Sequence, residues 1–302
     1  TPTLKMLVDR EAKISSFQKE KYHIVQIAAG GMEAASERME NADDAKALKA
    51  ACETAQTVCV SVTREKKTEQ PPRLYDLTTL QREANRLLGY TAKQTLDYAQ
   101  SLYEKKLLTY PRSDNRYLSD EHFYQAGDIA VAIAATMPEL ASATADMEKE
   151  QKHKAFNASK IEAHHAIIPT TKSGAGIQLS DKERNVYNLV AVYFIGLFYP
   201  DAIRDKTKIH FDIKGDTFTA TQSVLIQKGW EALGKDNDEE DDAEDAGTGG
   251  FDLSTLKFND SGLCESADVD KKKTTPARYF TESTLLAAMT SAAKFIDDPA
   301  LR

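Results

Sequence analysis

A tyrosine directly followed by a proline marks the stretch "LLTYPRSDNRYLSDEH", Leu107 to His122. Pro111 lacks a backbone donor and disfavours the α region for the residue before it, so the preceding helix must end before Tyr110. In an extended segment Arg112 projects to the same side as Tyr110, because side chains repeat every two residues. A phenol can attack phosphorus when a nearby cation favours the phenolate and balances charge on the phosphoryl oxygens. The spacing suits that chemistry, although packing or cation–π contact is the commoner reason for such a pair.

Two adjacent histidines form a second polar cluster in "IEAHHAIIPT", Ile161 to Thr170. In an extended segment His164 and His165 point to opposite sides, so at most one of them can face a given site. Zinc binding would need a further ligand, and only Glu162 is near in sequence. Three interpretations stay open: a metal site, one histidine donating a hydrogen bond to a phosphate, or a structural histidine.

The net charge of −8 comes from one run, "DNDEEDDAED" at residues 236–245. Without its eight acids, 39 basic and 39 acidic side chains remain, so the net charge excludes no class of partner. Residues 64–116 hold eleven Lys or Arg against seven Asp or Glu, a modest surplus around Tyr110 that suits a phosphate-binding face or an ordinary solvated surface.

Other candidate sites are weak. Cys52, Cys59 and Cys264 form no Cys-x-x-Cys pair and read as buried thiols. The "DNDEE" at 236–240 has the spacing of a magnesium-binding carboxylate cluster, but it lies in a solvated acidic run rather than at a strand end. No apolar run of about 18 residues and no charged-then-apolar leader is present, which predicts no membrane association and a cytoplasmic protein.

The order of periodic segments predicts an α+β fold in which a helical block interrupts a β-rich part. Residues 22–29 and 57–65 alternate like half-buried strands, and 207–230 reads as a β-meander that turns at Lys214-Gly215-Asp216. Between them lie helices with capping boxes, which begin at Thr78, Thr91 and Ser180. Residues 235–250 read as a mobile acidic loop, and a final helix opens near Thr281.

The two helices joined by "GYT" after Leu88 form a helix-turn-helix candidate. An ordinary antiparallel helix pair explains the same pattern equally well. A pure DNA-binding module is therefore the competing hypothesis of function. A protein that recognises duplex DNA needs, on an exposed recognition helix, side chains that can donate hydrogen bonds to the edges of the bases. The second helix, "AKQTLDYAQSLYEKK", offers few such side chains.

Several stretches together closely resemble type IA DNA topoisomerases. These are "PPRLYDLTTLQREANRLLGYTAKQTLDYAQSLYEKKLLTYPRSDNRYL", "AHHAIIPT", "TPARYFTESTLLAAM" and the opening "TPTLKMLVDREAKI", which span nearly the whole chain in the expected order. The Tyr-Pro pair and the His-His-Ala-Ile-Ile-Pro-Thr form look more like bacterial topoisomerase III than topoisomerase I.

The resemblance implies a toroidal enzyme that passes one DNA strand through a transient break in another. Tyr110 would be the nucleophile, joined to a 5′ phosphate at the break. Arg112 would position and neutralise that phosphate, and His164 would hydrogen-bond it. Contacts with single-stranded DNA would come from a further set: Thr281, Arg278, Arg116 and His165.

The resemblance also implies a division of the chain, with a winged-helix-like, catabolite activator-like domain standing on a β arch. The implied parts are a gate-base helix at 1–20, the arch at 21–76, the tyrosine-bearing domain at 77–205, the arch again at 206–270 and a return into the gate base at 271–302. The family's amino-terminal TOPRIM domain, which would bind the required magnesium, is missing from this sequence. We therefore expect a fragment of a nucleoid-associated bacterial enzyme that binds single-stranded DNA, holds no metal of its own and is inactive alone.

Overall fold

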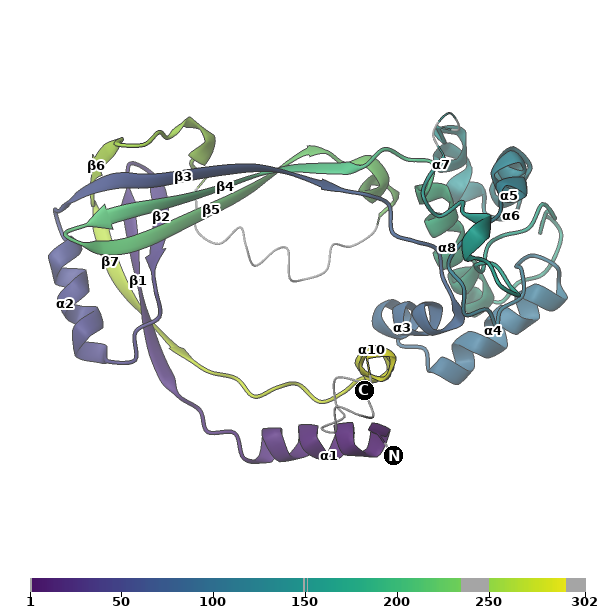
Figure 1. The fold of residues 1–302 in the computed structure, drawn as a ribbon, viewed down its shortest axis with the longest axis horizontal. Coiled ribbons are helices and arrows are strands. Elements are labelled where there is room, and N and C mark those ends of the chain that lie inside the picture. The colour runs from purple at the N-terminus through teal and green to yellow at the C-terminus, as the bar shows by residue number, and fades with distance from the viewer. Residues whose placement is uncertain (1, 149, 151, 235–249, 292–302) are drawn as a thin grey trace.

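A computed structural model describes residues 2–148, 150, 152–234 and 250–291. The elements form an arc that closes on itself, with a β-sheet at one end and a block of helices at the other (Figure 1). A long β-ribbon joins the two ends along one side of the arc. On the other side, helices α1 (Pro2–Ser15) and α10 (Glu282–Thr290) return toward the helical block. The predicted mixed α+β class is confirmed.

In the described part of the chain, seven strands form one antiparallel sheet in the order β6-β3-β4-β5-β2-β1-β7. The chain on both sides of the helical block contributes to it, because Val58–Glu69 of β3 pairs with Ala202–Asp212 of β4. The shared sheet was expected from the sequence. The strands are β1 (Lys21–Ala29), β2 (Met32–Ser36), β3 (Gln56–Glu69), β4 (Ala202–Ile213), β5 (Asp216–Gln227), β6 (Ser261–Leu263) and β7 (Ser266–Lys273).

The turn between β4 and β5 lies where the sequence predicts it. Lys214 and Gly215 both have positive φ, 55° and 98°, as a two-residue hairpin turn requires. The meander ends earlier than predicted, because β5 stops at Gln227 and Trp230 lies in the 3-10 helix η3 (Gly229–Leu233). Helix α2 (Ala42–Cys52) connects β2 to β3, and its Ala45, Leu48 and Cys52 join the core of the sheet.

The helical block contains α3 (Leu77–Leu88), α4 (Ala92–Glu104), α5 (Asp120–Tyr124), α6 (Ala126–Thr136), α7 (Ala141–Ala145) and α8 (Asp181–Gly196), with short 3-10 helices η1 (Pro138–Leu140) and η2 (Ala158–Lys160). The capping boxes predicted at Thr91 and Ser180 are present, and Thr281 caps α10 in the same way. The box predicted at Thr78 is wrong. Asp76 caps α3 instead, since its carboxylate accepts from the Thr79 amide at 2.7 Å and starts the helix before Thr78.

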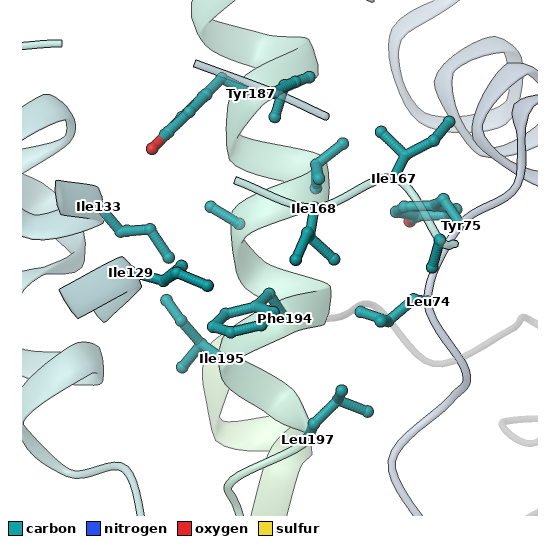
Figure 2. Close-up of a cluster of buried hydrophobic side chains, with 14 of the residues drawn as sticks. Leu74, Tyr75, Ile129, Ile133, Ile167, Ile168, Tyr187, Phe194, Ile195 and Leu197 are labelled. Atoms are coloured by element: carbon teal, nitrogen blue, oxygen red, sulfur yellow. The ribbon is translucent and has the colours of Figure 1, made fainter. Parts of the chain in front are cut away.

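The block has its own hydrophobic core around α8. Figure 2 shows Phe194 and Ile195 of α8 facing Ile129 and Ile133 on one side and Ile168 on the other. No helix in the described part of the chain is long and apolar enough to cross a membrane. The loop predicted at 235–250 lies outside the described residues except for Gly250, as do 292–302 of the last predicted part. A further short 3-10 helix, η5 (Leu253–Thr255), precedes β6.

Candidate active site around Tyr110

The segment before Tyr110 is held against the segment that follows the two histidines. Helix α4 ends at Glu104, and a left-handed residue, Lys106 with φ 63°, turns the chain out of it. The Thr109 amide donates to the Ile168 carbonyl at 2.9 Å, and Thr170 donates its amide to Leu107 at 3.0 Å. The two segments are therefore paired like short antiparallel strands.

The Thr109 hydroxyl adds two side-chain bonds to this pairing. It donates to the Ala166 carbonyl at 3.2 Å and accepts from the Ile168 amide at 3.0 Å. Ile167 and Ile168 are almost fully buried, so the histidine segment is anchored in the core of the helical block. The position of Tyr110 relative to the histidines is thus fixed by backbone bonds and by burial together.

The Tyr110 ring lies between two other rings. Its centroid is 4.6 Å from that of His164, with planes at 40°, and 5.7 Å from that of Tyr103, with planes at 78°. Tyr110 is half-buried. No described residue forms a hydrogen bond with the Tyr110 hydroxyl. The hydroxyl is not among the buried polar atoms that lack a partner, so it is accessible. The oxygen that would act as a nucleophile is open to an incoming group.

Arg112 is exposed and makes no hydrogen bond or ion pair with any described residue. The backbone beside it is fixed, because Ser113 donates its hydroxyl to the His165 carbonyl at 2.6 Å and accepts the Leu77 amide on its own carbonyl at 2.9 Å. A guanidinium mounted in this way keeps all its donors for a ligand.

The two adjacent histidines point to opposite sides, as their alternation predicts. His164 contacts Tyr110, whereas the His165 ring lies 4.3 Å from that of His122. His165 Nδ1 is 2.8 Å from the Ala166 carbonyl oxygen, to which it can donate. Burial, and then the nearby His165, lower the pKa of His122 to about 4, so His122 is neutral near neutral pH.

The remaining predicted DNA contacts lie in two other places. Arg116 is half-buried and donates from Nε to the Leu74 carbonyl at 2.7 Å and from one Nη to the Arg73 carbonyl at 2.9 Å. Thr281 is exposed at the start of α10, and its Oγ1 accepts the Thr284 amide at 3.1 Å. Arg278 is the residue whose carbonyl accepts from Arg10 at 2.6 Å. Arg116 is thus tied to the loop before α3, while Thr281 and Arg278 come from the carboxyl-terminal segment.

A charged cluster at the end of α4 escaped the sequence analysis. The Glu183 carboxylate on α8 accepts from Ser101 at 2.6 Å and forms an ion pair with Lys105. Burial opposes its ionisation, but hydrogen bonds from Lys105, Ser101 and Ser180 outweigh that effect and lower the pKa of Glu183 to about 2. The only sequence signal was the capping box of Ser180 with Glu183. The cluster fixes the helical turn that precedes Tyr110.

The described residues include no group of three or more His, Cys, Asp or Glu side chains that could hold a metal ion. Cys52, Cys59 and Cys264 are buried free thiols, as the sequence predicts. The pairing of His164 with a tyrosine ring and of His165 with His122 also leaves no metal-ligand arrangement at the histidine pair. Among these residues, the chemical groups shown beside the Tyr110 phenol are the His164 imidazole and the Tyr103 phenol.

The family model described as DNA topoisomerase matches residues 1–293. The chain belongs to the type IA DNA topoisomerase family. Two relatives among many are DNA topoisomerase 3 of Vibrio cholerae, 40% identical over 82% of this chain and 38% of that protein, and DNA topoisomerase 3 of Bacillus licheniformis, 35% identical over 98% of this chain and 42% of that protein. The chain is thus homologous to bacterial topoisomerase III.

The fold is similar to that of full-length topoisomerase I from Thermotoga maritima, with a TM-score of 0.70 and 23% identity. The match covers 97% of this chain and 48% of that structure. This type IA topoisomerase chain therefore spans about two fifths of the length of the curated relatives and about half of the solved structure.

Proposed function

We propose that this chain carries the strand-cleaving tyrosine of a type IA topoisomerase, and that Tyr110 attacks a phosphodiester of single-stranded DNA. The phenolic oxygen forms a bond to phosphorus while the bond to the 3′ oxygen breaks, which leaves a 5′-phosphotyrosine. The reverse transfer reseals the strand. One ester bond replaces another at each step, so the cycle needs no external energy source.

The observation that carries this proposal is the environment of the Tyr110 hydroxyl. The Tyr110 ring lies beside the His164 ring, its hydroxyl has no partner among the described residues, and Arg112, which is exposed and also unpaired among them, follows two residues later in the turn at 111–112. In this proposal Arg112 binds the phosphate and balances the charge that develops on its oxygens. His164 donates a hydrogen bond to the same phosphate, which its exposed position permits.

Roles for the other residues follow from where they lie. Arg116 uses part of its guanidinium to hold the loop before α3, so its contribution to DNA binding is at most through its remaining donors. His165 turns away from Tyr110 toward His122 and acts on DNA only indirectly. Thr281 and Arg278 contact the DNA backbone where the carboxyl-terminal segment returns to the helical block.

The division of the chain is part of the same proposal. The helical block, 77–205, is the tyrosine-bearing, winged-helix-like domain, and the sheet segments 21–76 and 206–270 form the arch that carries it. Segments 1–20 and 271–302 belong to the base of the gate, and the whole forms one side of a toroid. The arrangement of the sheet, the helical block and the returning helices α1 and α10 supports this division (Figure 1).

Magnesium, which the family uses, does not fit the described residues, because they contain no carboxylate cluster to bind it. We therefore place its binding on a TOPRIM domain outside this sequence. The leaving 3′ oxygen also needs a proton, and His164, whose ring lies beside that of Tyr110, is the candidate donor in this chain. The chain by itself is expected to bind single-stranded DNA weakly and not to cleave it.

Two measurements test the proposal. Binding of this chain to a fluorescent single-stranded oligonucleotide should weaken as salt rises, because phosphate contacts release counterions. Joined to the amino-terminal part of the Vibrio cholerae relative, the chain should form a covalent DNA adduct that survives denaturant. Tyr110→Phe should abolish the adduct, and Tyr103→Phe, which also removes a nearby phenol, is the matched control. An adduct that persists in Tyr110→Phe would refute the assignment.

The alternative of a duplex-reading helix-turn-helix finds little support in the exposed face of α4. Its Lys93 forms an ion pair with Asp97 at 2.7 Å, and the other exposed side chains of the helix include Glu104 and Tyr103. The start of α4 is occupied by Glu282 of α10, whose carboxylate accepts from the Ala92 amide at 2.6 Å. These contacts leave few donors for base edges.

A further inference from the structure

Tyr103 is a partly exposed aromatic side chain that packs against the Tyr110 ring. It lies in the last turn of α4, it is 40% exposed, and its ring meets that of Tyr110 in an edge-to-face arrangement. Edge-to-face packing with centroids 5.7 Å apart lies within the favourable range for aromatic pairs. Among the described residues, Tyr103 and His164 therefore provide the ring contacts of Tyr110.

The orientation of Tyr110 depends on these rings. Pro111 restricts the backbone of Tyr110 but leaves the side-chain torsions free to choose among rotamers. No hydrogen bond from a described residue holds its hydroxyl. Without Tyr103, one of these ring contacts is lost, and the Tyr110 ring can rotate away from its place beside His164.

Tyr103 is itself rigidly mounted. Ser101 and Lys105, on either side of it, both bind the Glu183 carboxylate of α8, and the intervening Leu102 is fully buried. The turn that carries Tyr103 is therefore tied to the central helix of the block. The Tyr103 hydroxyl forms no hydrogen bond with any described residue, so its ring and not its hydroxyl makes the contact.

We infer that Tyr103 is a positioning residue that holds the Tyr110 ring in the orientation needed for attack on phosphorus. The inference rests on the proposed role of Tyr110. A misdirected nucleophile lowers the rate of the chemical step without weakening DNA binding. Replacement of Tyr103 by a residue without a ring should therefore slow adduct formation, whereas phenylalanine should preserve it.

The first arm of the test uses this chain alone, labelled with 13C in its tyrosine rings, with the Tyr110 signal assigned by Tyr110→Phe. Tyr103→Leu should shift the Tyr110 ring signal and increase its averaging, and Tyr103→Phe should do neither. Tyr124→Leu, at a tyrosine that is 82% exposed and pairs with Phe123, is the matched control and should leave the signal unchanged. An unchanged Tyr110 signal in Tyr103→Leu overturns the inference.

The second arm measures single-turnover adduct formation in the chain joined to the amino-terminal part of the Vibrio cholerae relative. Tyr103→Leu should slow the reaction about threefold to tenfold at saturating DNA, as expected from the strength of an aromatic pair, with the Kd for DNA unchanged. Tyr103→Phe should stay within about twofold of the unsubstituted protein. An equal loss in Tyr103→Phe, or a weaker Kd with an unchanged saturated rate, overturns the inference. If the unsubstituted joined protein forms no adduct, the proposed function is refuted instead. The first arm then still tests whether Tyr103 holds the Tyr110 ring.

Discussion

The arc of the molecule is closed where α10 packs against α3, and two hydrogen bonds join the start of α10 to the helical block there. The Glu282 carboxylate accepts from the Ala92 amide at the first residue of α4, at 2.6 Å. The Asn85 side chain of α3 accepts from the Ser283 amide at 3.0 Å. Each bond satisfies an amide in the first turn of a helix that has no partner within its own helix. Figure 1 shows α10 lying beside α3 at this closure.

Removal of both bonds by Glu282→Ala with Asn85→Ala should open the arc. A bond to a charged acceptor contributes about 1.5 kcal/mol at the lower end of its range, which suits the exposed Glu282, and a neutral bond contributes about 1 kcal/mol. Because the exposed amides regain water, we take about 2 kcal/mol as the combined effect, which is roughly a 30-fold shift toward the open form. If the domain must leave the base to admit DNA, this closure limits how often it does so.

Spin labels at Lys13→Cys on α1 and Val131→Cys on α6 can report the opening as a distance distribution. Both positions are exposed, whereas the three natural cysteines are buried and should resist labelling. The double variant should show a longer and broader distribution than the parent. Glu104→Ala, at an exposed glutamate near the other end of α4, is the matched control. An unchanged distribution in a double variant with unchanged circular dichroism would show that other contacts close the arc.

Three further outcomes follow from single side chains. His122 has a folded pKa near 4, below its unfolded value of 6.5, so the unfolded state binds the extra proton and stability should fall as pH drops from about 6.5 to 4. We expect about 1–2 kcal/mol after solvent screening, and His122→Gln should flatten that part of a urea-unfolding pH profile. Glu183 has a lowered pKa, so its contribution is present above about 4.5 and is lost toward pH 2. Glu183→Gln should cost about 2–3 kcal/mol at pH 7 in the same assay and much less at pH 2, and an equal cost at both pH values would contradict the ionic role. Arg112→Ala should reduce adduct formation in the extended protein about 100-fold or more, and Arg112→Lys less; a loss under about threefold would exclude Arg112 from the chemistry.

Local signals in the sequence predicted much of the fold. The strands 22–29 and 57–65, the turn at Lys214-Gly215 and the caps at Thr91 and Ser180 depend on neighbouring residues, and all of them are found. The cap at Thr78 was wrong because two candidate caps lie two residues apart and the carboxylate of Asp76 is the better acceptor. Strands β6 and β7 escaped prediction, since β7 carries three lysines and its pairing partner β1 is some 240 residues away in sequence.

The site was predictable only in part, because local patterns are visible in the sequence and contacts between distant segments are not. Alternation along the chain predicts that His164 and His165 point apart, and the ring contacts confirm it. It also placed Arg112 on the side of Tyr110, but residues 111–112 form a turn and not the extended segment on which that prediction depended, because Pro111 favours a turn here. The contacts that position Tyr110 come from distant segments, such as Ile168 bonded to Thr109. No spacing rule could reveal them, nor could it indicate that Tyr103 turns its ring toward Tyr110.

The two arginines that follow Tyr110 show how the structure separates functions that the sequence leaves equivalent. Both are cations in one short loop, but Arg116 donates to two backbone carbonyls of the chain before α3, whereas Arg112 has no partner among the described residues. Those carbonyls belong to Arg73 and Leu74, and they would otherwise need other donors. Arg116 thus holds the loop in place. The fixed loop leaves Arg112 with all its donors unused among the described residues, and a cation with unused donors is what a phosphate beside Tyr110 would require.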